Sequence, residues 1–528
     1  MKTPQQLLQQ TLEVGACLLP DAASGGRTPY PAVFVHGLLG WGARDALYRA
    51  VPYWGLAAGD VLGYLNTCGY DCRAASVGII SSAWDRACEL YAELTGGTAD
   101  YGIAHAQRFG HARFGTAYPA PLVPDWGADR PIDLVGHSFG GATARLLLQL
   151  LADGCPEEVQ AAAAAGETPS PLFTGGKAGW VHALVAIAAP HDGSTFLDVQ
   201  PDAADALSTL FLGAARALGI SAFKGVYDFR LDQFGIRRDP DEPLTTAALR
   251  MLAQNPLPAG DNAFDDLRPA GARALNARIR TLQDTWYFSI PCCRTLPRLL
   301  THDQKPDTAM TPLLWPFSTA MGRDGAGMPR GWLPNDGLVN TISARHPDGA
   351  PHADFTPDRT PARGVWQVLP VENLDHLAAI GGVMNNGVVR ARLFYRRVMA
   401  LLDAAAAADW PPQALPMTGH TIPQSAQDKI RSVWIMDSIE SYLRKLIVAS
   451  VGAADLGCEK LGKLLDECVA RGEVTVEKGR VLNEELKRTC KQAVAKDAAE
   501  KPAVDVDAMS AEEREALLQK LLAMKEEG

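Results

Sequence analysis

The chain has 528 residues, of which 47% are hydrophobic and 21% are charged, a composition that is typical of globular proteins and excludes wholesale disorder. At roughly 150 residues per domain, this length allows two to four domains or one large enzyme with an appendage, and it excludes a single small binding module. The formal net charge is −10, from 50 basic and 60 acidic residues, so the chain lacks the basic surface that nucleic-acid binding requires.

The N-terminal region, which we assign to an extension at 1–29, contains no continuous hydrophobic signal core. No apolar run reaches the roughly 18 to 20 residues that span a bilayer. We therefore expect a protein that is soluble as written and not transmembrane, although a leader cleaved before this sequence stays open. The ten cysteines are too dilute for a disulfide scaffold, but Cys68 and Cys72 are candidates for one bridge after export.

Residues 30–408 alternate short apolar runs with glycine turns and helical segments. The run Ala32–His36 predicts a first strand, and Ile132–Val135 predicts another, each ending in a glycine turn. Gly140–Leu151 has the apolar period of a buried helix, and Ala183–Ala189 indicates a further buried strand. Strands that alternate with helices predict the α/β class, with a mostly parallel sheet that helices cover on both faces.

The composition changes after this region. Prolines cluster between residues 409 and 426, too densely for a helix, and we place a linker there. From 427 to 528, glycines are sparse and charges of both signs interleave with aliphatic residues at helical spacing. This pattern predicts an all-helical C-terminal domain, such as a coiled coil, which would serve as an oligomerisation or docking appendage.

The segment Gly136–Gly140 matches the pattern G-x-S-x-G and lies between a predicted strand and a predicted helix. A sharp strand-to-helix turn needs the flanking glycines because side chains there would clash, and it exposes the serine hydroxyl at a helix N-terminus. An ordinary serine in a glycine-rich turn is the alternative. The strand–turn–helix context favours Ser138 as a catalytic nucleophile.

A serine nucleophile needs a base and an orienting acid, which follow it as Asp or Glu and then His in the α/β-hydrolase fold. Histidines that lie well downstream are His191, His302, His346, His352, His376 and His420. We favour His376 as the base because it ends a loop before an apolar helical segment. Asp336, on a turn about 40 residues earlier, is favoured as the acid over Asp375, which would struggle to reach the ring of its own neighbour.

The tetrahedral intermediate of such a reaction also needs an oxyanion hole. The compact, glycine-flanked loop His36–Gly40 follows the first predicted strand and would let one main-chain amide face the serine. We expect the backbone N–H groups of Leu38 and Phe139 to be the donors. Their side chains are then unconstrained by this role.

Over residues 30 to 400, the chain resembles the bacillary and staphylococcal true-lipase family. The resemblance is carried by Val35–Gly42, Trp84–Glu89, Gly96–Gly102, Gly110–Gly115, Gly136–Gly141, Pro190–Gly193, Tyr227–Gln233, Asn335–Thr341 and Asp375–Leu377. It implies the α/β-hydrolase fold, with a lid helix and a zinc-binding insertion. It also implies Ser138, Asp336 and His376 as the catalytic triad, the same three residues that the G-x-S-x-G context and the chain order favour.

The resemblance further implies a structural zinc site in the insertion, at about 80–116 and 255–265. Two imidazoles and two carboxylates can form a closed tetrahedron that neutralises Zn²⁺ and leaves no position for water. Without the resemblance, surface histidines at this spacing would not indicate a metal. The implied ligands are Asp85, His105, His111 and Asp261.

Relatives also carry a calcium site, formed partly by acidic residues just after the catalytic histidine. Here that stretch is Leu377–Asn386, in which apolar side chains replace the oxygen ligands that a hard cation needs. We expect no calcium there.

At the lid position, residues 201–224, the segment Ala203–Ile220 is amphipathic. An apolar face that covers the site in water and turns to lipid at an interface would explain action on aggregated esters, although an ordinary core helix fits the periodicity equally well. We expect a serine carboxylic-ester hydrolase, a triacylglycerol-type lipase that acts on lipid esters through an acyl-enzyme. Relatives are usually secreted, and a cytoplasmic location stays open.

Two alternatives remain. Relatives also cleave aliphatic polyesters, and Leu464–Glu485 in the tail is similar to helical phasin-type proteins of polyhydroxyalkanoate granules, so a polyester depolymerase is one alternative. The other is a non-catalytic scaffold that binds a granule or partner through the tail. An intact triad argues against this scaffold.

Overall fold

In a computed structural model of the chain, the described residues are 27–199, 230, 232–234, 241–243, 246, 250, 258–298, 301–324, 328–356, 361–382 and 387–409. The chain divides into two units, Met1–Leu415 and Pro416–Gly528. The predicted lid at 201–224, linker at 409–426 and helical domain at 427–528 lie wholly or almost wholly outside the described residues. These assignments, and the N-terminal extension, therefore stay predictions.

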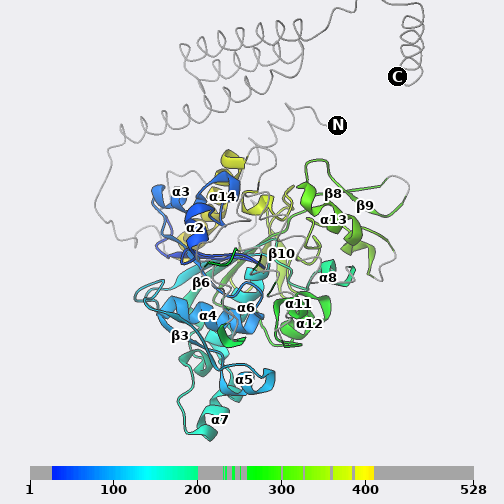
Figure 1. Cartoon of the computed structure of the whole chain (residues 1–528). Helices are drawn as coiled ribbons and strands as arrows, with labels where there is room; N and C mark the ends of the chain where they lie inside the picture. Colours follow the sequence, from blue (N-terminus) through cyan, green and yellow to red (C-terminus); the bar gives the residue numbers. More distant parts are fainter. Residues whose placement is uncertain are drawn as a thin grey trace, which may run out of the picture. The chain divides into compact units, whose positions relative to one another are not determined.

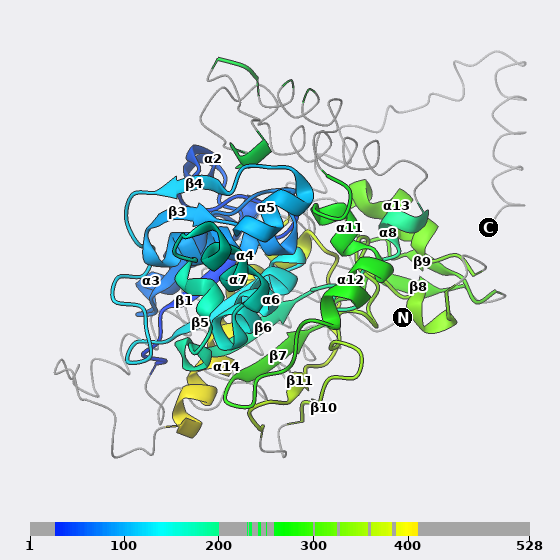
Figure 2. The same cartoon turned by 90° about the horizontal axis from the view of Figure 1, so that it is seen from below.

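A seven-stranded sheet forms the centre of the first unit, in the order β10-β11-β7-β6-β5-β1-β2. Every neighbouring pair in this sheet is parallel, as predicted, and Figure 2 shows the order from β1 to β10. The strands are β1 (Ala32–Val35), β2 (Cys72–Ala75), β5 (Ile132–His137), β6 (Val181–Ile187), β7 (Trp286–Ile290), β10 (His352–Asp354) and β11 (Trp366–Val368).

Two hydrophobic layers sandwich this sheet because successive side chains of a strand point to opposite faces. Val33 and Val35 of β1 belong to one buried cluster, which includes helices α4 (Ala83–Thr95) and α6 (Phe139–Asp153). Ala32 and Phe34 belong to the other, which includes α3 (Val61–Thr67) and α14 (Gly387–Asp409). Figure 1 shows α3 and α14 on one side of the sheet and α4 and α6 on the other.

The remaining elements surround this core. Two small antiparallel sheets pair β3 (Gly97–Asp100) with β4 (Phe114–Tyr118) and β8 (Thr295–Pro297) with β9 (Gln304–Pro306). The other helices in the described part of the chain are α2 (Ala46–Ala50), α5 (Ile103–Phe109), α7 (Pro156–Ala165), α8 (Phe196–Val199), α11 (Ala263–Leu267), α12 (Pro269–Asn276) and α13 (Trp315–Met321). Short 3-10 helices are η1 (Leu56–Ala58), η2 (Pro171–Thr174), η3 (Ala178–Trp180), η4 (Asp232–Phe234), η5 (Pro312–Leu314), η6 (Arg330–Trp332) and η7 (Ala378–Ile380).

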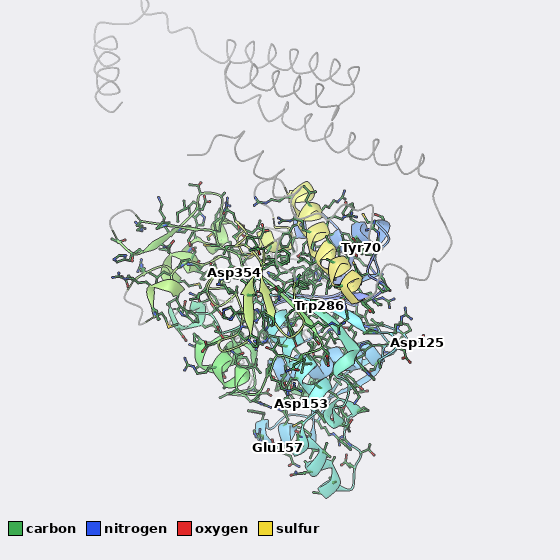
Figure 3. All side chains as sticks on the ribbon, turned by 180° about the vertical axis from the view of Figure 1, so that it is seen from behind. Tyr70, Asp125, Asp153, Glu157, Trp286 and Asp354 are labelled. Carbon is green, nitrogen blue, oxygen red and sulfur yellow. The ribbon has the colours of Figure 1, made fainter. Side chains whose placement is uncertain are left out.

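Helix α14 closes the first unit and is fixed by polar contacts as well as by packing. Asp403 accepts a hydrogen bond from the Tyr70 hydroxyl at 2.7 Å and another from the Thr28 backbone N–H at 2.7 Å. Figure 3 shows Tyr70 beside this helix. The last described helix of the unit is thereby tied to the chain just before β1.

Two expectations need adjustment. Cys68 and Cys72 are free thiols, so the suggested bridge is absent; burial raises the pKa of the Cys72 thiol. Strand β6 ends at Ile187 rather than at residue 189, because Ala188 has a φ of 47°, which ends an extended strand.

Among the described residues, we find no helix with the length and apolar character needed to cross a bilayer.

Candidate active site

Ser138 stands at the turn between β5 and α6, with a φ of 55° and a ψ of −128°. A Cβ on Gly136 would lie 2.7 Å from the Gly140 backbone, and a Cβ on Gly140 would lie 2.1 Å from the Val35 carbonyl oxygen. Real Cβ atoms do not approach backbone this closely, so both positions require glycine. The local sequence therefore forms the sharp turn that was predicted, with the serine at its tip.

Asp336 and His376 form a buried pair. The Nδ1 atom of His376 lies 2.8 Å from one carboxylate oxygen of Asp336, and the other oxygen accepts the backbone N–H groups of Leu338 at 3.0 Å and Val339 at 2.8 Å. The backbone N–H of His376 also donates to the Asp336 carbonyl at 2.9 Å. This arrangement fixes the imidazole orientation and leaves Nε2 as the nitrogen available to a substrate or nucleophile.

The His376 ring lies next to the serine turn, because its centroid is 4.6 Å from that of the His137 ring, and His137 immediately precedes Ser138. Asp375 has a different role: its carboxylate accepts the backbone N–H groups of Thr311 at 2.9 Å and Ala378 at 2.9 Å. Asp375 thus anchors the loop and the start of η7. The structure pairs His376 with Asp336, the acid that the sequence favoured.

The other histidines that the sequence offered lie elsewhere. His191 packs against Trp366, with ring centroids 4.6 Å apart. His346 and His352 stack on each other at 3.5 Å. His420 lies outside the described residues.

The loop after β1 lies directly against the serine. A Cβ on Gly37 would be 2.7 Å from the Ser138 Cβ and 3.2 Å from its Oγ. Among the described residues, the Leu38 N–H has no acceptor, whereas the next N–H, of Leu39, donates to the Ile79 carbonyl at 2.9 Å. Phe139 is the first residue of α6, so its N–H has no acceptor within the helix. Both expected oxyanion donors are therefore unused where they flank Ser138.

Arg86, for which the sequence predicts no role, supports this loop from α4. Its buried guanidinium donates to the carbonyls of His36 and Gly78 and to the Thr143 hydroxyl, the last at 2.8 Å. It also lies 5.1 Å from the centroid of the Phe139 ring. The only signal in the sequence was an arginine in a largely apolar helix, within the segment Trp84–Glu89 quoted for the family.

The four implied metal ligands come together. Asp85 lies on α4, His105 on α5, His111 just after α5 and Asp261 just before α11, and their ligand atoms lie within 4.8 Å of one another. The His105 Nε2 is 3.3 Å from an Asp85 oxygen and 3.2 Å from an Asp261 oxygen, and the His111 Nε2 is 3.2 Å from the other Asp261 oxygen. Figure 1 shows α5 beyond α4, away from the sheet.

The chemistry of this cluster fits a cation. One oxygen of Asp85, both oxygens of Asp261 and the Nε2 atoms of both histidines are buried and form no hydrogen bond with any described residue. The His111 Nδ1 lies 2.8 Å from the Ala112 carbonyl, which leaves its Nε2 free for a metal. Burial alone would lower the pKa of His105, but the carboxylates of Asp261 and Asp85 raise it to about 9. Buried polar atoms without hydrogen bonds cost free energy, and a cation bound between these five atoms would remove that cost.

Comparison with known proteins identifies relatives of this chain. Residues 28–401 match a family model described as "Lipase-like, C-terminal domain". Lipase 2 of Staphylococcus aureus is 34% identical over 354 residues, which cover 67% of this chain and 50% of that protein. The lipase of Staphylococcus hyicus is 31% identical over 368 residues, or 69% of this chain and 56% of that protein. The chain thus spans about half the length of these curated relatives.

Solved structures agree. EstA from Clostridium botulinum superposes with a TM-score of 0.65 and 34% identity, covering 72% of this chain and 89% of that one. Lipase 1 from Pelosinus fermentans superposes with a TM-score of 0.60 and 38% identity, covering 71% of this chain and 98% of that one. The crystal structure of Staphylococcus hyicus lipase superposes with a TM-score of 0.62 and 29% identity, covering 74% of this chain and 100% of that one. Together with the parallel sheet, these matches confirm the predicted α/β-hydrolase type of fold.

Proposed function

The chain belongs to the lipase-like C-terminal domain family, as its resemblance to bacillary and staphylococcal true lipases predicted, and on that premise we propose that it is a serine carboxylic-ester hydrolase. The substrates we propose are lipid esters of the triacylglycerol type. The observation that carries the proposal is the buried pair of His376 and Asp336, 2.8 Å apart, beside a serine in a strained turn with two unused N–H groups around it.

In the proposed reaction, the Ser138 hydroxyl attacks the ester carbonyl carbon while the His376 Nε2 takes its proton. Asp336 holds the Nδ1–H and stabilises the imidazolium. The N–H groups of Leu38 and Phe139 donate to the oxyanion of the tetrahedral intermediate. The intermediate collapses as the imidazolium protonates the leaving alcohol, which gives an acyl-enzyme. A water molecule, deprotonated by His376, then releases the carboxylic acid and restores the serine.

Substitutions at the triad test this proposal on tributyrin and on p-nitrophenyl butyrate. We expect Ser138→Ala to abolish fluorophosphonate labelling and to lower kcat about 10⁶-fold, and Asp336→Asn to lower it about 10⁴-fold, because the asparagine would hold the wrong imidazole tautomer. Asp375→Asn is the matched control, since its carboxylate contacts backbone amides, and it should act on stability instead. Unchanged hydrolysis by the Ser138→Ala protein would contradict the proposal.

We also propose that Asp85, His105, His111 and Asp261 hold a structural Zn²⁺. The support is the donor set, two imidazoles and two carboxylates, with its five unsatisfied buried atoms. Four protein ligands leave no position for a reacting water, so the ion would stabilise the fold and take no part in hydrolysis. The absence of calcium after His376, activation at a lipid interface by residues 201–224, and docking by the C-terminal helices remain predictions.

The alternatives differ in their support. Against the non-catalytic scaffold stands the arrangement around Ser138, where the buried pair of His376 and Asp336 and two unused N–H groups lie beside the serine. Polyester hydrolysis would use the same groups, and only the substrate separates it from lipid hydrolysis. A comparison of lipid and polyester substrates distinguishes the two.

A further inference from the structure

Tyr53 links the two halves of the proposed oxyanion hole. Its hydroxyl oxygen accepts the backbone N–H of Gly37 at 3.0 Å and lies 2.8 Å from the Nδ1 atom of His137. Gly37 precedes Leu38 in the loop after β1, and His137 precedes Ser138 in the turn after β5. One buried hydroxyl therefore bridges the segment that carries one N–H donor and the segment that carries the nucleophile and the other donor.

The direction of these hydrogen bonds follows from the groups involved. Gly37 N–H can only donate, so the Tyr53 oxygen accepts, and the hydroxyl proton is left to donate elsewhere. Among the described residues, His137 Nδ1 is its only other hydrogen-bonding neighbour. Burial lowers the pKa of His137 well below its usual range and raises that of Tyr53, so both groups are neutral and Nδ1 can accept.

Aromatic packing holds the hydroxyl in this position. The Tyr53 ring packs edge to face on Trp41 and Trp54, with centroids 5.5 Å and 5.2 Å away, and the side chain is only 4% exposed. A rigid ring with a fixed hydroxyl is suited to set a spacing between two backbone segments. Removing the hydroxyl would leave the Gly37 N–H without an acceptor at the loop where Leu38 must be aligned.

We propose that Tyr53 is a positioning residue for the oxyanion hole, through the chain of hydrogen bonds from Gly37 N–H to the Tyr53 hydroxyl to His137 Nδ1. The inference rests on the proposed function, because the hole is useful only if Ser138 forms a tetrahedral intermediate. Tyr53 touches no reacting atom. Its effect would appear in the stabilisation of the transition state, with little change in how the substrate ester binds.

The test compares Tyr53→Phe with Tyr287→Phe in the full chain. The Tyr287 hydroxyl also accepts a backbone N–H, from Leu282 at 3.1 Å, and is also buried, but it lies on β7 outside the catalytic groups. Both variants lose the same kind of hydrogen bond. We expect Tyr53→Phe to lower kcat on p-nitrophenyl butyrate about 10- to 100-fold with KM within about twofold, and Tyr287→Phe to leave kcat within about twofold.

A transition-state analogue supplies a readout that a merely structural role would not change. A trifluoromethyl ketone adds to the serine and places an oxyanion in the hole, so its affinity for Tyr53→Phe should fall in parallel with kcat/KM. Should Tyr53→Phe fail to fold, His137→Gln, which keeps an acceptor for the hydroxyl, should retain at least about tenfold more kcat than His137→Leu.

The outcomes are distinct. Equal kcat for Tyr53→Phe and wild type, or equal losses in Tyr53→Phe and Tyr287→Phe, would overturn the positioning role, as would equal activity of the two His137 variants. If wild-type protein neither hydrolyses the ester nor reacts with a fluorophosphonate, the proposed function itself fails.

Discussion

Ser138 occupies a backbone conformation that costs on the order of 1–3 kcal/mol for a residue with a side chain, so its surroundings must hold it there. Its N–H donates to the Ile187 carbonyl at 2.9 Å, and its carbonyl accepts the Gly141 N–H at 3.0 Å. These bonds join the serine turn to the neighbouring strand β6 and to the first turn of α6. The strain is local, and the rigid sheet offsets it.

At the same scale, Gly37 offers a test of how closely the oxyanion loop must approach the serine. Gly37→Ala would place a Cβ 2.7 Å from the Ser138 Cβ and 3.2 Å from its Oγ. We expect kcat to fall about 100-fold, because the loop or the serine must shift by a fraction of an ångström. The measurement is kcat on p-nitrophenyl butyrate, with circular dichroism to verify folding.

Gly127→Ala is the control for this prediction, since a Cβ at that position meets nothing within 4 Å. Activity of the Gly37→Ala protein equal to that of Gly127→Ala would show that the close approach of the loop is not required for catalysis.

Among the secondary-structure elements, helix α4 connects the candidate metal cluster with the loop after β1 that carries the proposed oxyanion donor Leu38. Asp85 belongs to the candidate metal cluster, and the next residue, Arg86, donates to the carbonyls of the oxyanion loop and of Gly78. A metal ion would join α4 to α5 and to the segment before α11, which lie far apart in the sequence. The fold of the segment between β3 and β4, which carries α5, would then depend on the ion.

Metal removal tests this dependence. We expect about one Zn²⁺ per chain, and we expect a chelator to lower Tm by about 5–10 °C, because the buried carboxylates would lose their counter-charge and metal binding contributes to folding. His111→Ala should abolish the metal content and lower Tm similarly, as measured by elemental analysis and calorimetry. His302→Ala, at an exposed loop residue, is the control. A wild-type protein without stoichiometric metal after dialysis against Zn²⁺ would exclude the site.

Elements that depend on local patterns were predictable from the sequence. Apolar runs that end in glycine predict β1 and β5, and the glycine turn around Ser138 predicts the start of α6. The place of Asp336 and His376 after this turn makes them candidates for the acid and the base. β10 and β11 have three residues each, too few to show an alternating pattern. The metal cluster joins Asp85 to Asp261, which lie far apart in the sequence, so only the family resemblance indicated it.

Tyr53 and Arg86 mark the other limit of sequence reasoning. Their contribution depends on which polar groups their side chains reach, and most of those partners lie on other elements of the fold. A tyrosine before a tryptophan gives no local signal of such contacts, and an arginine among the many apolar residues of α4 gives only a weak one. Tertiary structure alone reveals them.

For the molecule as a whole, the candidate catalytic and metal-binding residues all lie in the first unit, Met1–Leu415. Within that unit, α14 packs against α3 and η1 and its Asp403 binds Tyr70 and Thr28. The proposed chemistry therefore needs no residue after α14, which ends at Asp409. We expect the second unit, Pro416–Gly528, to influence where the protein is located or which substrate it reaches.

A chain that stops after Leu415 tests this separation of roles. We expect its kcat/KM on p-nitrophenyl butyrate and tributyrin to stay within about twofold of the full chain, because removal touches no catalytic group or core contact described above. Triolein emulsions and polyhydroxybutyrate granules, assayed with both proteins, then report on the tail. If the tail docks on a polyester surface, only the full chain should bind and degrade granules efficiently. If the shortened protein loses its activity on the small ester, the second unit contributes to the hydrolase itself and the proposed separation is wrong.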